Sequence, residues 1–218
     1  MKLLNPILAT LLLACSTVSY AAENTDNSSP LTQLQQLWAE NNYQLKGDAQ
    51  EKAFESLLKT ADETLKSHTD DANILIWHGI INSTFAGVTG GLSALKYAKI
   101  AKKDFEQALK INPEALHGSA YTSLGVLYFK VPGWPIGFGD DDKAQELLQK
   151  ALTLNPDGID SNYFYAEFLR DDDKYQQAKQ YYQKALAAAP RVGREVADAG
   201  RRQEIETAMA DVEKHLKQ

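Results

Sequence analysis

The sequence is poor in the residues that carry thiol and metal chemistry. Its 218 residues contain a single cysteine, Cys15, and only four histidines. Cys15 lies in an N-terminal stretch with the character of a removable export signal, so the mature chain is expected to hold no thiol. Disulfides, thiol catalysis, and zinc or iron–sulfur sites with cysteine ligands are then excluded, even in an oxidising compartment.

The placement of the histidines and the absence of common catalytic motifs also argue against a metal site or an active site. His78 and His117 lie 39 residues apart, and neither has a second ligand at i+3 or i+4. His68 and His215 lie among charged residues near expected helix ends. The chain contains no H-E-x-x-H, G-x-S-x-G or Walker motif. We therefore expect no metal, no cofactor and no catalytic residue, and a protein that is not an enzyme.

The chain also lacks an excess of basic residues. It has 23 lysines and arginines against 29 aspartates and glutamates, a formal net charge of −6, which argues against a nucleic-acid partner. Three acidic runs lack the alternating spacing of a calcium-binding loop: Asp70–Asp71, Asp140–Asp142 and Asp171–Asp173. Each run precedes an expected helix, so these aspartates are predicted to cap helix N-termini.

The N-terminal apolar run, Ile7–Leu13, is too short to cross a membrane. Lys2 precedes it and the small-residue stretch Ser19–Ala21 follows it, which is the pattern of a secretory signal. An alternative is a bacterial lipobox, Leu12–Cys15, in which a lipidated Cys15 would anchor the protein to the outer membrane, facing the periplasm. Either signal predicts an exported protein, in the periplasm if the signal is bacterial.

What the sequence does contain is a repeated pattern of small residues, large residues and prolines. In residues 159–190, numbered as a 34-residue unit, Ala166 and Ala178 stand at positions 8 and 20. Tyr182 follows at position 24 and Pro190 at position 32. Two antiparallel helices can approach closely only where facing residues are small, and proline cannot continue a helix. The pattern therefore predicts a helix–turn–helix unit that ends at the proline.

Two earlier segments repeat this pattern. Positions 20, 24, 27 and 32 are occupied by Ala144, Leu148, Ala151 and Pro156 in one, and by Ala101, Phe105, Ala108 and Pro113 in the other. Gly125 and Gly79 stand at position 8. With its period of 34 residues, the sequence resembles the tetratricopeptide repeat family. The resemblance implies an all-α solenoid of antiparallel helix pairs with about three recognisable repeats.

The repeats divide the chain into successive helical units. The expected segments are a signal at 1–21, a flexible leader at 22–30, a degenerate N-terminal helical pair at 31–67, repeats at 72–113, 116–156 and 159–190, and a C-terminal capping helix at 192–218. The apolar stripe of the capping helix is predicted to be Val196, Ala199, Ile205, Met209, Val212 and Leu216.

Two insertions distinguish these repeats from a regular array. In the first, at 86–99, Gly87, Gly90 and Gly91 are expected to end one helix and turn the chain. The second, at 131–141, places Trp134 and Phe138 in a loop stiffened by prolines. Large apolar groups in a loop either pack onto neighbouring helices or serve as anchors for a partner. Both interpretations of the second loop stay open.

Helix geometry predicts which side chains face the concave surface. Positions 2, 5, 9 and 12 of each first helix are Asn73, Ile76, Ile80 and Ser83, then Ser119, Thr122, Val126 and Phe129, then Asp160, Tyr163, Glu167 and Arg170. The groove is expected to be apolar and rich in hydroxyls at the first two repeats and charged at the third. It lacks the Lys/Arg/Asn set of the co-chaperones that clamp a terminal carboxylate.

The loop Pro132–Ala144, P-G-W-P-I-G-F-G-D-D-D-K-A, resembles that of a group of secreted bacterial repeat proteins. Through its turn at Gly137–Asp140 the chain is more distantly similar to the T-component of TRAP transporters. This resemblance implies an accessory protein of an uptake or envelope system. Two hypotheses follow: a periplasmic scaffold that binds a protein or peptide in an open concave groove, or a small-molecule carrier whose groove the insertions close into a cavity of a few hundred cubic ångströms.

Overall fold

The computed structural model describes residues 29–217, so the expected signal, Cys15 and most of the expected leader lie outside the described residues. Within the described range the chain forms nine α-helices and one short 3-10 helix. They are α1 (Pro30–Tyr43), α2 (Gly47–Ser67), α3 (Ala72–Thr89), α4 (Gly91–Ile111), η1 (Ala115–Gly118), α5 (Ser119–Lys130), α6 (Asp141–Leu154), α7 (Ile159–Asp171), α8 (Tyr175–Ala187) and α9 (Glu195–His215). None of these helices is long and apolar enough to traverse a bilayer.

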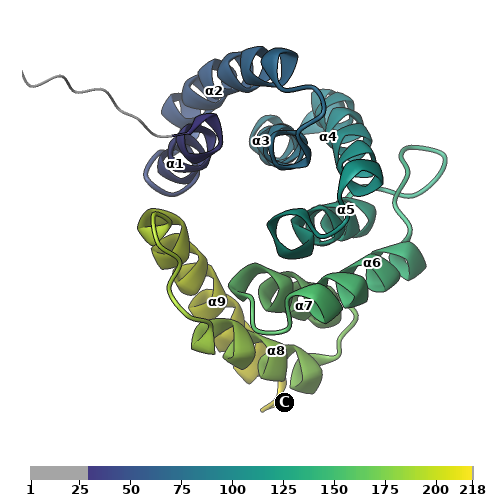
Figure 1. Ribbon diagram of the computed structural model, residues 1–218. Helices are drawn as coiled ribbons and strands as arrows, with labels where there is room; N and C mark the ends of the chain where they lie inside the picture. Colours follow the sequence, from purple (N-terminus) through teal and green to yellow (C-terminus); the bar gives the residue numbers. More distant parts are fainter. Residues whose placement is uncertain (1–28, 218) are drawn as a thin grey trace, which may run out of the picture.

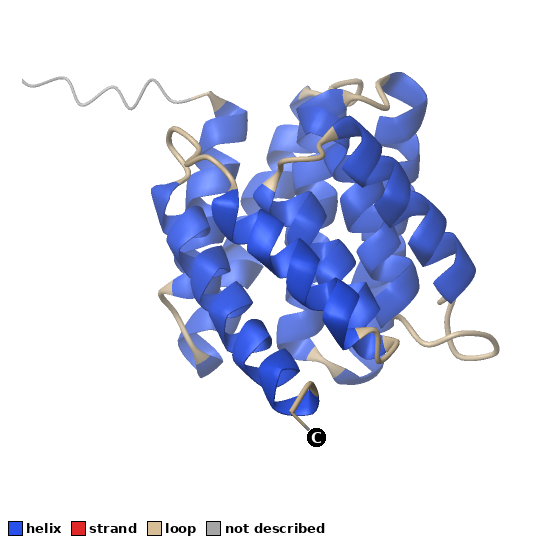
Figure 2. Ribbon diagram, turned by 90° about the horizontal axis from the view of Figure 1, so that it is seen from below, coloured by secondary structure: helices blue, strands red, loops and turns tan. Residues whose placement is uncertain are grey.

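The helices form two concentric layers (Figure 1). Helices α1, α3, α5 and α7 lie on the inside, and α2, α4, α6 and α8 lie on the outside. Each inner helix packs on the outer helix that follows it, and each pair packs on the next pair. The described part of the chain is helical throughout, with tan loops between blue helices in Figure 2. The predicted all-α helix–turn–helix solenoid is confirmed.

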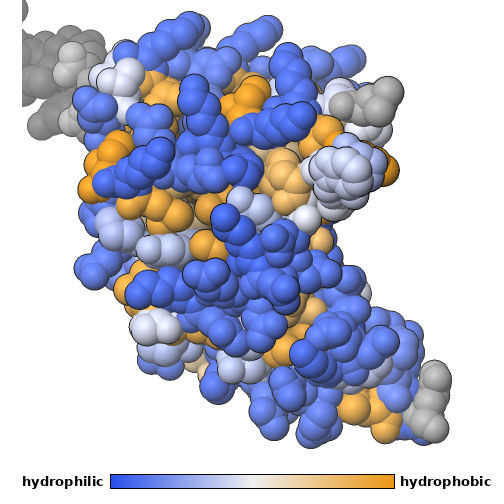
Figure 3. Space-filling view, turned by 90° about the vertical axis from the view of Figure 1, so that its right-hand side faces the viewer, coloured by the Kyte–Doolittle hydropathy of each residue, from blue (hydrophilic) through white to orange (hydrophobic). Residues whose placement is uncertain are grey.

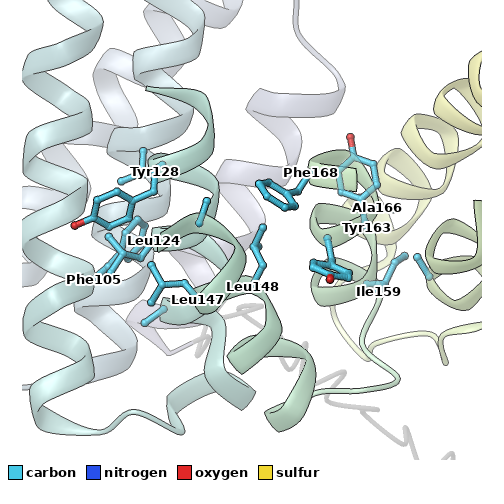
Figure 4. Packing of buried hydrophobic residues seen from close by; sticks show 14 of the residues in the cluster. Phe105, Leu124, Tyr128, Leu147, Leu148, Ile159, Tyr163, Ala166 and Phe168 are labelled. Carbon is cyan, nitrogen blue, oxygen red and sulfur yellow. The ribbon is translucent and has the colours of Figure 1, made fainter. Parts of the chain in front are cut away.

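The repeat positions form the core of this solenoid. Nine residues at positions 20, 24 and 27 have no exposed side-chain surface: Ala101, Phe105, Ala108, Ala144, Leu148, Ala151, Ala178, Tyr182 and Ala185. The small residues at position 8 meet the large ones at position 24, because a Cβ on Gly79 would lie 2.5 Å from the Phe105 ring. Figure 4 shows the buried residues continuing from α4 and α5 across to α7.

Aspartates cap two of the three helices for which capping was predicted. The Asp71 carboxylate accepts the backbone N–H of Asn73 at 2.8 Å, at the start of α3. The Asp140 carboxylate accepts the N–H of Lys143 at 3.0 Å, at the start of α6. The prediction for Asp171–Asp173 was wrong, because α7 continues through Asp171 and α8 begins after an uncapped Lys174.

The first insertion is helical and lengthens both α3 and α4. Gly87 was expected to end a helix, but it lies within α3, which continues to Thr89. Gly90 and Gly91 alone make the turn, with φ of +61° and +60°, a left-handed backbone that glycine adopts without strain. Helix α4 begins directly at Gly91. The insertion therefore extends the α3–α4 wall of the solenoid.

His78 connects three helices from the interior of the solenoid. Its Nδ1 lies 2.7 Å from Asp104 on α4, and its Nε2 lies 2.8 Å from Asp62 on α2. Burial lowers the pKa of His78, but the hydrogen bonds to Asp104 and Asp62 outweigh it, so the net shift of the pKa is upward. The histidine that the sequence left without a role is thus a buried ionic bridge.

The C-terminal helix closes the solenoid into a ring. Helix α9 packs on α8 and α7, and it also contacts α1 at the other end of the chain (Figure 1). The Tyr43 hydroxyl donates to Glu204 at 3.3 Å, and the Tyr43 ring occupies the space that a side chain on Gly200 would need. The two ends of the repeat array therefore meet.

This closure changes which face of α9 is buried. Val196, Ala199 and Leu216 were placed in its apolar stripe, but all three are exposed. Ile205 and Val212 of the predicted stripe are buried, and Ala197, Asp198, Arg201 and Ala208 are buried with them. A helix that packs on α1 as well as on α8 buries a wider face than a simple end cap, and part of that face is charged.

Candidate functional site: the central groove

Closure of the ring leaves a cavity of about 450 Å³ between the inner helices. It is lined by α1, α3, α5, α7, the loop that leads into α9, and the start of α9. Six of the predicted concave residues line it: Ile80, Ser83, Ser119, Thr122, Val126 and Asp160. The structure thus brings together residues from all three repeats. We call this cavity the central groove.

The other six predicted residues lie elsewhere. Ile76 is fully buried, because neighbours cover α3 on nearly every side. Phe129 packs edge-to-face on Phe168, with ring centroids 5.5 Å apart. Asn73 lines a separate hollow at the α2–α3 turn.

Tyr163, Glu167 and Arg170 line a second hollow of about 970 Å³, between the α1–α2 turn, α7 and α9. Their charges are mutually satisfied, since Arg170 donates to Glu167 at 2.9 Å. Glu167 also accepts the Tyr182 hydroxyl. Burial raises the pKa of Tyr163 to about 12. Helix α9 forms part of the lining of this second hollow, and its position could not be inferred from the repeat pattern.

Two tryptophans that the sequence reasoning missed form an aromatic wall of the central groove. Trp38 on α1 and Trp77 on α3 meet edge-to-face, with ring centroids 5.7 Å apart. The Trp38 indole N–H donates to the Thr84 hydroxyl at 2.9 Å, which fixes the ring. Both side chains are almost fully buried. Trp38 precedes the first recognisable repeat, so no repeat position indicated it.

Three arginines also line the central groove. Arg191 and Arg194 lie in the loop before α9, and Arg201 lies on α9. They were missed because this part of the chain follows the last repeat. A cluster of four arginines between residues 191 and 202 was the available signal.

Asp160 neutralises two of these arginines. Arg201 Nε donates to one carboxylate oxygen at 2.9 Å, and Arg191 Nη1 donates to the other at 2.7 Å. Burial by itself would raise the pKa of Asp160. The positive charges of Arg201 and Arg191 have the opposite and larger effect, so the pKa is lowered to about 2. Arg191 and Arg201 each have a second carboxylate partner, Asp198 at 2.6 Å and Glu204 at 2.6 Å respectively. Asp160 therefore holds α7 against α9 and has little capacity left for a ligand.

Arg194 differs from its two neighbours. Its guanidinium carbon lies 4.8 Å from the centroid of the Trp77 ring. It forms no ion pair within residues 29–217, and its Nε is buried with no hydrogen-bond partner there. Burial, and then the charge of Arg191, lower the pKa of Arg194.

A short left-handed segment also borders the central groove. Leu116 and His117 have φ of +48° and +55°, and Gly118 follows at +77°. Such a conformation is unfavourable for residues other than glycine and persists only where surrounding structure holds it. Here it places Leu116 and His117 along the wall of the cavity.

The second insertion lies on the outside of the ring, away from the central groove (Figures 1 and 2). Phe138 packs edge-to-face on Tyr128, with ring centroids 5.7 Å apart, whereas Trp134 is 89% exposed and Ile136 is 69% exposed. The structure therefore separates the two predicted anchors. Phe138 joins the core, and Trp134 remains at the surface.

The backbone of this loop is held by its own hydrogen bonds. Gly139 N–H donates to Pro132 at 3.0 Å, and Gly137 N–H donates to Gly133 at 3.1 Å. A Cβ on Gly139 would collide with the backbone of Val131. Figure 3 looks onto the side of the molecule that carries the loop, where small hydrophobic patches are surrounded by hydrophilic residues.

Residues 159–191 match the tetratricopeptide repeat model. A tetratricopeptide protein of Thermus thermophilus, TTC0263, aligns with 84% of this chain and 96% of its own, at 18% identity and a TM-score of 0.55. The fold is that of a tetratricopeptide-repeat solenoid. MamA residues 41 to the end, from Desulfovibrio magneticus RS-1, align with 87% of this chain and 93% of that chain at 15% identity and a TM-score of 0.44. Comparison with curated proteins gave no match.

No group of three or more histidine, cysteine, aspartate or glutamate side chains in the described range is arranged to hold a metal ion. The central groove instead combines aromatic rings, hydroxyls and one unpaired guanidinium. That combination can hold a ligand by packing, hydrogen bonding and charge.

Proposed function

We propose that this tetratricopeptide solenoid is an exported, non-catalytic scaffold that binds another protein. The single observation that carries the proposal is the pair of exposed apolar side chains, Trp134 and Ile136, on an internally hydrogen-bonded loop. A large apolar side chain on a rigid backbone loses little conformational freedom when it binds, which makes it an effective interface anchor. The helical-repeat fold supports the same function, since stacked repeats present extended surfaces.

The closed ring moves the proposed protein contact from the concave face to the outer loop. An α-helix with its side chains is about 10–12 Å across, and a cavity of about 450 Å³ has no room for such a peptide. The concave-face contact expected from the sequence is thereby restricted to a short extended segment or a small molecule. The loop has no such restriction.

Photo-crosslinking tests the scaffold proposal. A photoreactive phenylalanine analogue at Trp134 is expected to capture a specific protein in the exported fraction of cells that produce the chain. The same analogue at Val192, which is fully exposed on the loop before α9, is the matched control. Identical adducts from both positions, or none from Trp134, would contradict a role for the loop in binding.

The enclosed groove favours a second candidate function, small-molecule binding. Its volume of about 450 Å³ falls within the usual range of ligand sites, about 300–1,000 Å³. Helix α9 forms the closure, in place of the two insertions that the sequence led us to expect. A ligand-binding accessory protein like the T-component of TRAP transporters would use such a cavity.

We further propose a periplasmic location, which rests on the N-terminal signal pattern. Cleavage after Ala21 would release a soluble protein, and lipidation of Cys15 would anchor it to the outer membrane. The chain shows no basic excess that would suit nucleic acid. A protein partner, with or without a small ligand, is consistent with either form.

A further inference from the structure

Two of the three arginines that line the central groove are paired with carboxylates. Its lining includes three arginines and two aspartates, Asp157 and Asp160. Arg191 and Arg201 share Asp160, and each also has a carboxylate of α9 as a partner. Arg194 is the only one of the three without an ion pair in residues 29–217. Within residues 29–217 the groove therefore presents one guanidinium, that of Arg194, and one carboxylate, that of Asp157, without an ion pair.

The surroundings of Arg194 fit a bound anion. Its side chain lines the groove and has no carboxylate partner in residues 29–217. A carboxylate accepts two parallel hydrogen bonds from a guanidinium, which makes it the natural complement of such a group. The guanidinium is already oriented, because it lies over the Trp77 ring.

The remainder of the groove fits an apolar or aromatic body. Trp38, Trp77, Ile80 and Val126 form one wall. Hydroxyls on α5, those of Ser119 and Thr122, can bond to polar atoms of a ligand. The apolar body of a ligand can pack on such a wall by dispersion.

We infer that the central groove binds a small monocarboxylate with an aromatic or apolar body, its carboxylate paired with Arg194 and its body against the half-buried side chains of Ile80 and Val126. This inference rests on the second candidate function, small-molecule binding. A single negative charge is expected because the carboxylate of Asp157, which has no ion pair in residues 29–217, lies in the same cavity and would repel a dianion such as phosphate.

Calorimetric titration of the full mature chain with two probes tests the inference. Indole-3-acetate carries the required carboxylate, and indole-3-acetamide has nearly the same shape without the charge. The wild-type protein is expected to bind the acetate at least about tenfold more tightly, because hydrogen bonds to charged groups are the stronger ones. Inorganic phosphate is expected not to compete.

Arg194→Gln should weaken acetate binding about tenfold and leave acetamide binding unchanged. Lys150→Gln, which removes one charge from the exposed face of α6, is the matched control and should change neither. Circular dichroism verifies that both variants are folded, and the comparison of the two probes on wild type needs no variant at all.

The outcomes distinguish failure of the monocarboxylate inference from failure of the small-molecule-binding function on which it rests. Equal binding of acetate and acetamide would overturn the role of Arg194 but retain a small-molecule site. Competition by phosphate, or full acetate affinity in Arg194→Gln, would also overturn the inference. Failure of both probes to bind would overturn the inference and remove support for small-molecule binding, while leaving the crosslinking test of the scaffold unaffected.

Discussion

Gly79 on α3 faces the ring of Phe105 on α4 so closely that any side chain at position 79 must displace the ring. A Cβ added to Gly79 would lie 2.5 Å from the Phe105 Cε1 atom. Phe105 has no exposed surface and is surrounded by the core, so it has no free space to move into. The small-against-large pairing that defines the repeat is therefore a direct contact between two helices.

Gly79→Ala is expected to destabilise the protein by up to about 2 kcal/mol. Overpacking a filled core costs about 1–3 kcal/mol, and the better helix propensity of alanine offsets up to about 1 kcal/mol of that. Gly87→Ala is the matched control, because Gly87 lies in the same helix with no atom within 4 Å of its would-be Cβ. It should stabilise by about 0.5–1 kcal/mol. Urea unfolding measures both, and effects of the same sign would contradict the packing argument.

The repeat core could be predicted from the sequence because its determinants recur at fixed spacing. Gly79, Phe105 and their equivalents are close in sequence and identical in role from one repeat to the next. Ring closure could not be predicted, because it depends on Tyr43 and Glu204, 161 residues apart. The sequence offers no periodic signal for such a contact.

Only the part of the candidate site that lies within the repeats could be predicted, because the sequence outside the repeats carries no periodic signal. Helix geometry placed Ile80 and Ser119 correctly in the central groove. Arg194 was not predicted, because it lies in a loop after the last repeat, where the repeat positions no longer indicate which side chains face the groove. Asp160 was placed in the groove, but the two arginines that occupy its carboxylate come from the closing segment.

The buried bridge at His78 makes stability depend on pH. The pKa of His78 is raised above its usual value of 6.5 in the folded protein. Its protonation therefore stabilises the fold fully at pH below about 6.5, and that contribution is lost as the pH rises through the folded-state pKa. We expect the free energy of unfolding to fall across this interval, as measured by urea titrations between pH 5.5 and 9.

His78→Gln should remove this pH dependence and lower stability by about 3 kcal/mol at pH 6, because it leaves the buried Asp104 carboxylate without its cationic partner. His68→Gln is the control, since it also removes one histidine, but from an exposed helix end. It should keep the slope of the wild type. An unchanged slope in His78→Gln would show that the bridge does not titrate in this range.

The two aromatic residues of the outer loop should differ in their effect on stability. Phe138→Ala is expected to lower the free energy of unfolding by about 1–3 kcal/mol, because it removes the ring that packs on Tyr128. Trp134→Ala should change it by less than about 0.5 kcal/mol, because that side chain is 89% exposed. Thermal or urea unfolding measures both. A large loss in Trp134→Ala would mean that the tryptophan packs on the protein, which would weaken its proposed role as an anchor.

The N-terminal pattern predicts the form of the mature protein. After expression in a bacterium, intact-mass analysis is expected to show a chain that begins at residue 22 or 23 and is recovered in the periplasmic fraction. A chain that begins at Cys15 with the added mass of acyl groups would support the lipid-anchored alternative. Cys15→Ser separates the two, because it blocks lipidation and leaves the cleavage after Ala21 intact. Retention of Met1 in a cytoplasmic product would contradict both.

Ring closure predicts a local effect from a single methyl group. Gly200→Ala places a Cβ in the space occupied by the Tyr43 ring, and both residues lie where α1 meets α9. Hydrogen exchange followed by mass spectrometry should show faster exchange in α1 and α9, with the repeats from α3 to α8 little changed, because those pack independently of the closure.

Tyr43→Ala tests whether Gly200→Ala acts through collision with the Tyr43 ring. It removes the colliding ring, so the double variant Tyr43→Ala/Gly200→Ala should be no less stable than Tyr43→Ala alone, a positive coupling of about 1 kcal/mol or more between contacting residues. Ala199→Ser, at the exposed neighbouring position on α9, should leave exchange unchanged. Additive effects of Tyr43→Ala and Gly200→Ala would show that the two residues do not meet in solution. In that case the ring would be open and the central groove would lose the wall that α9 provides.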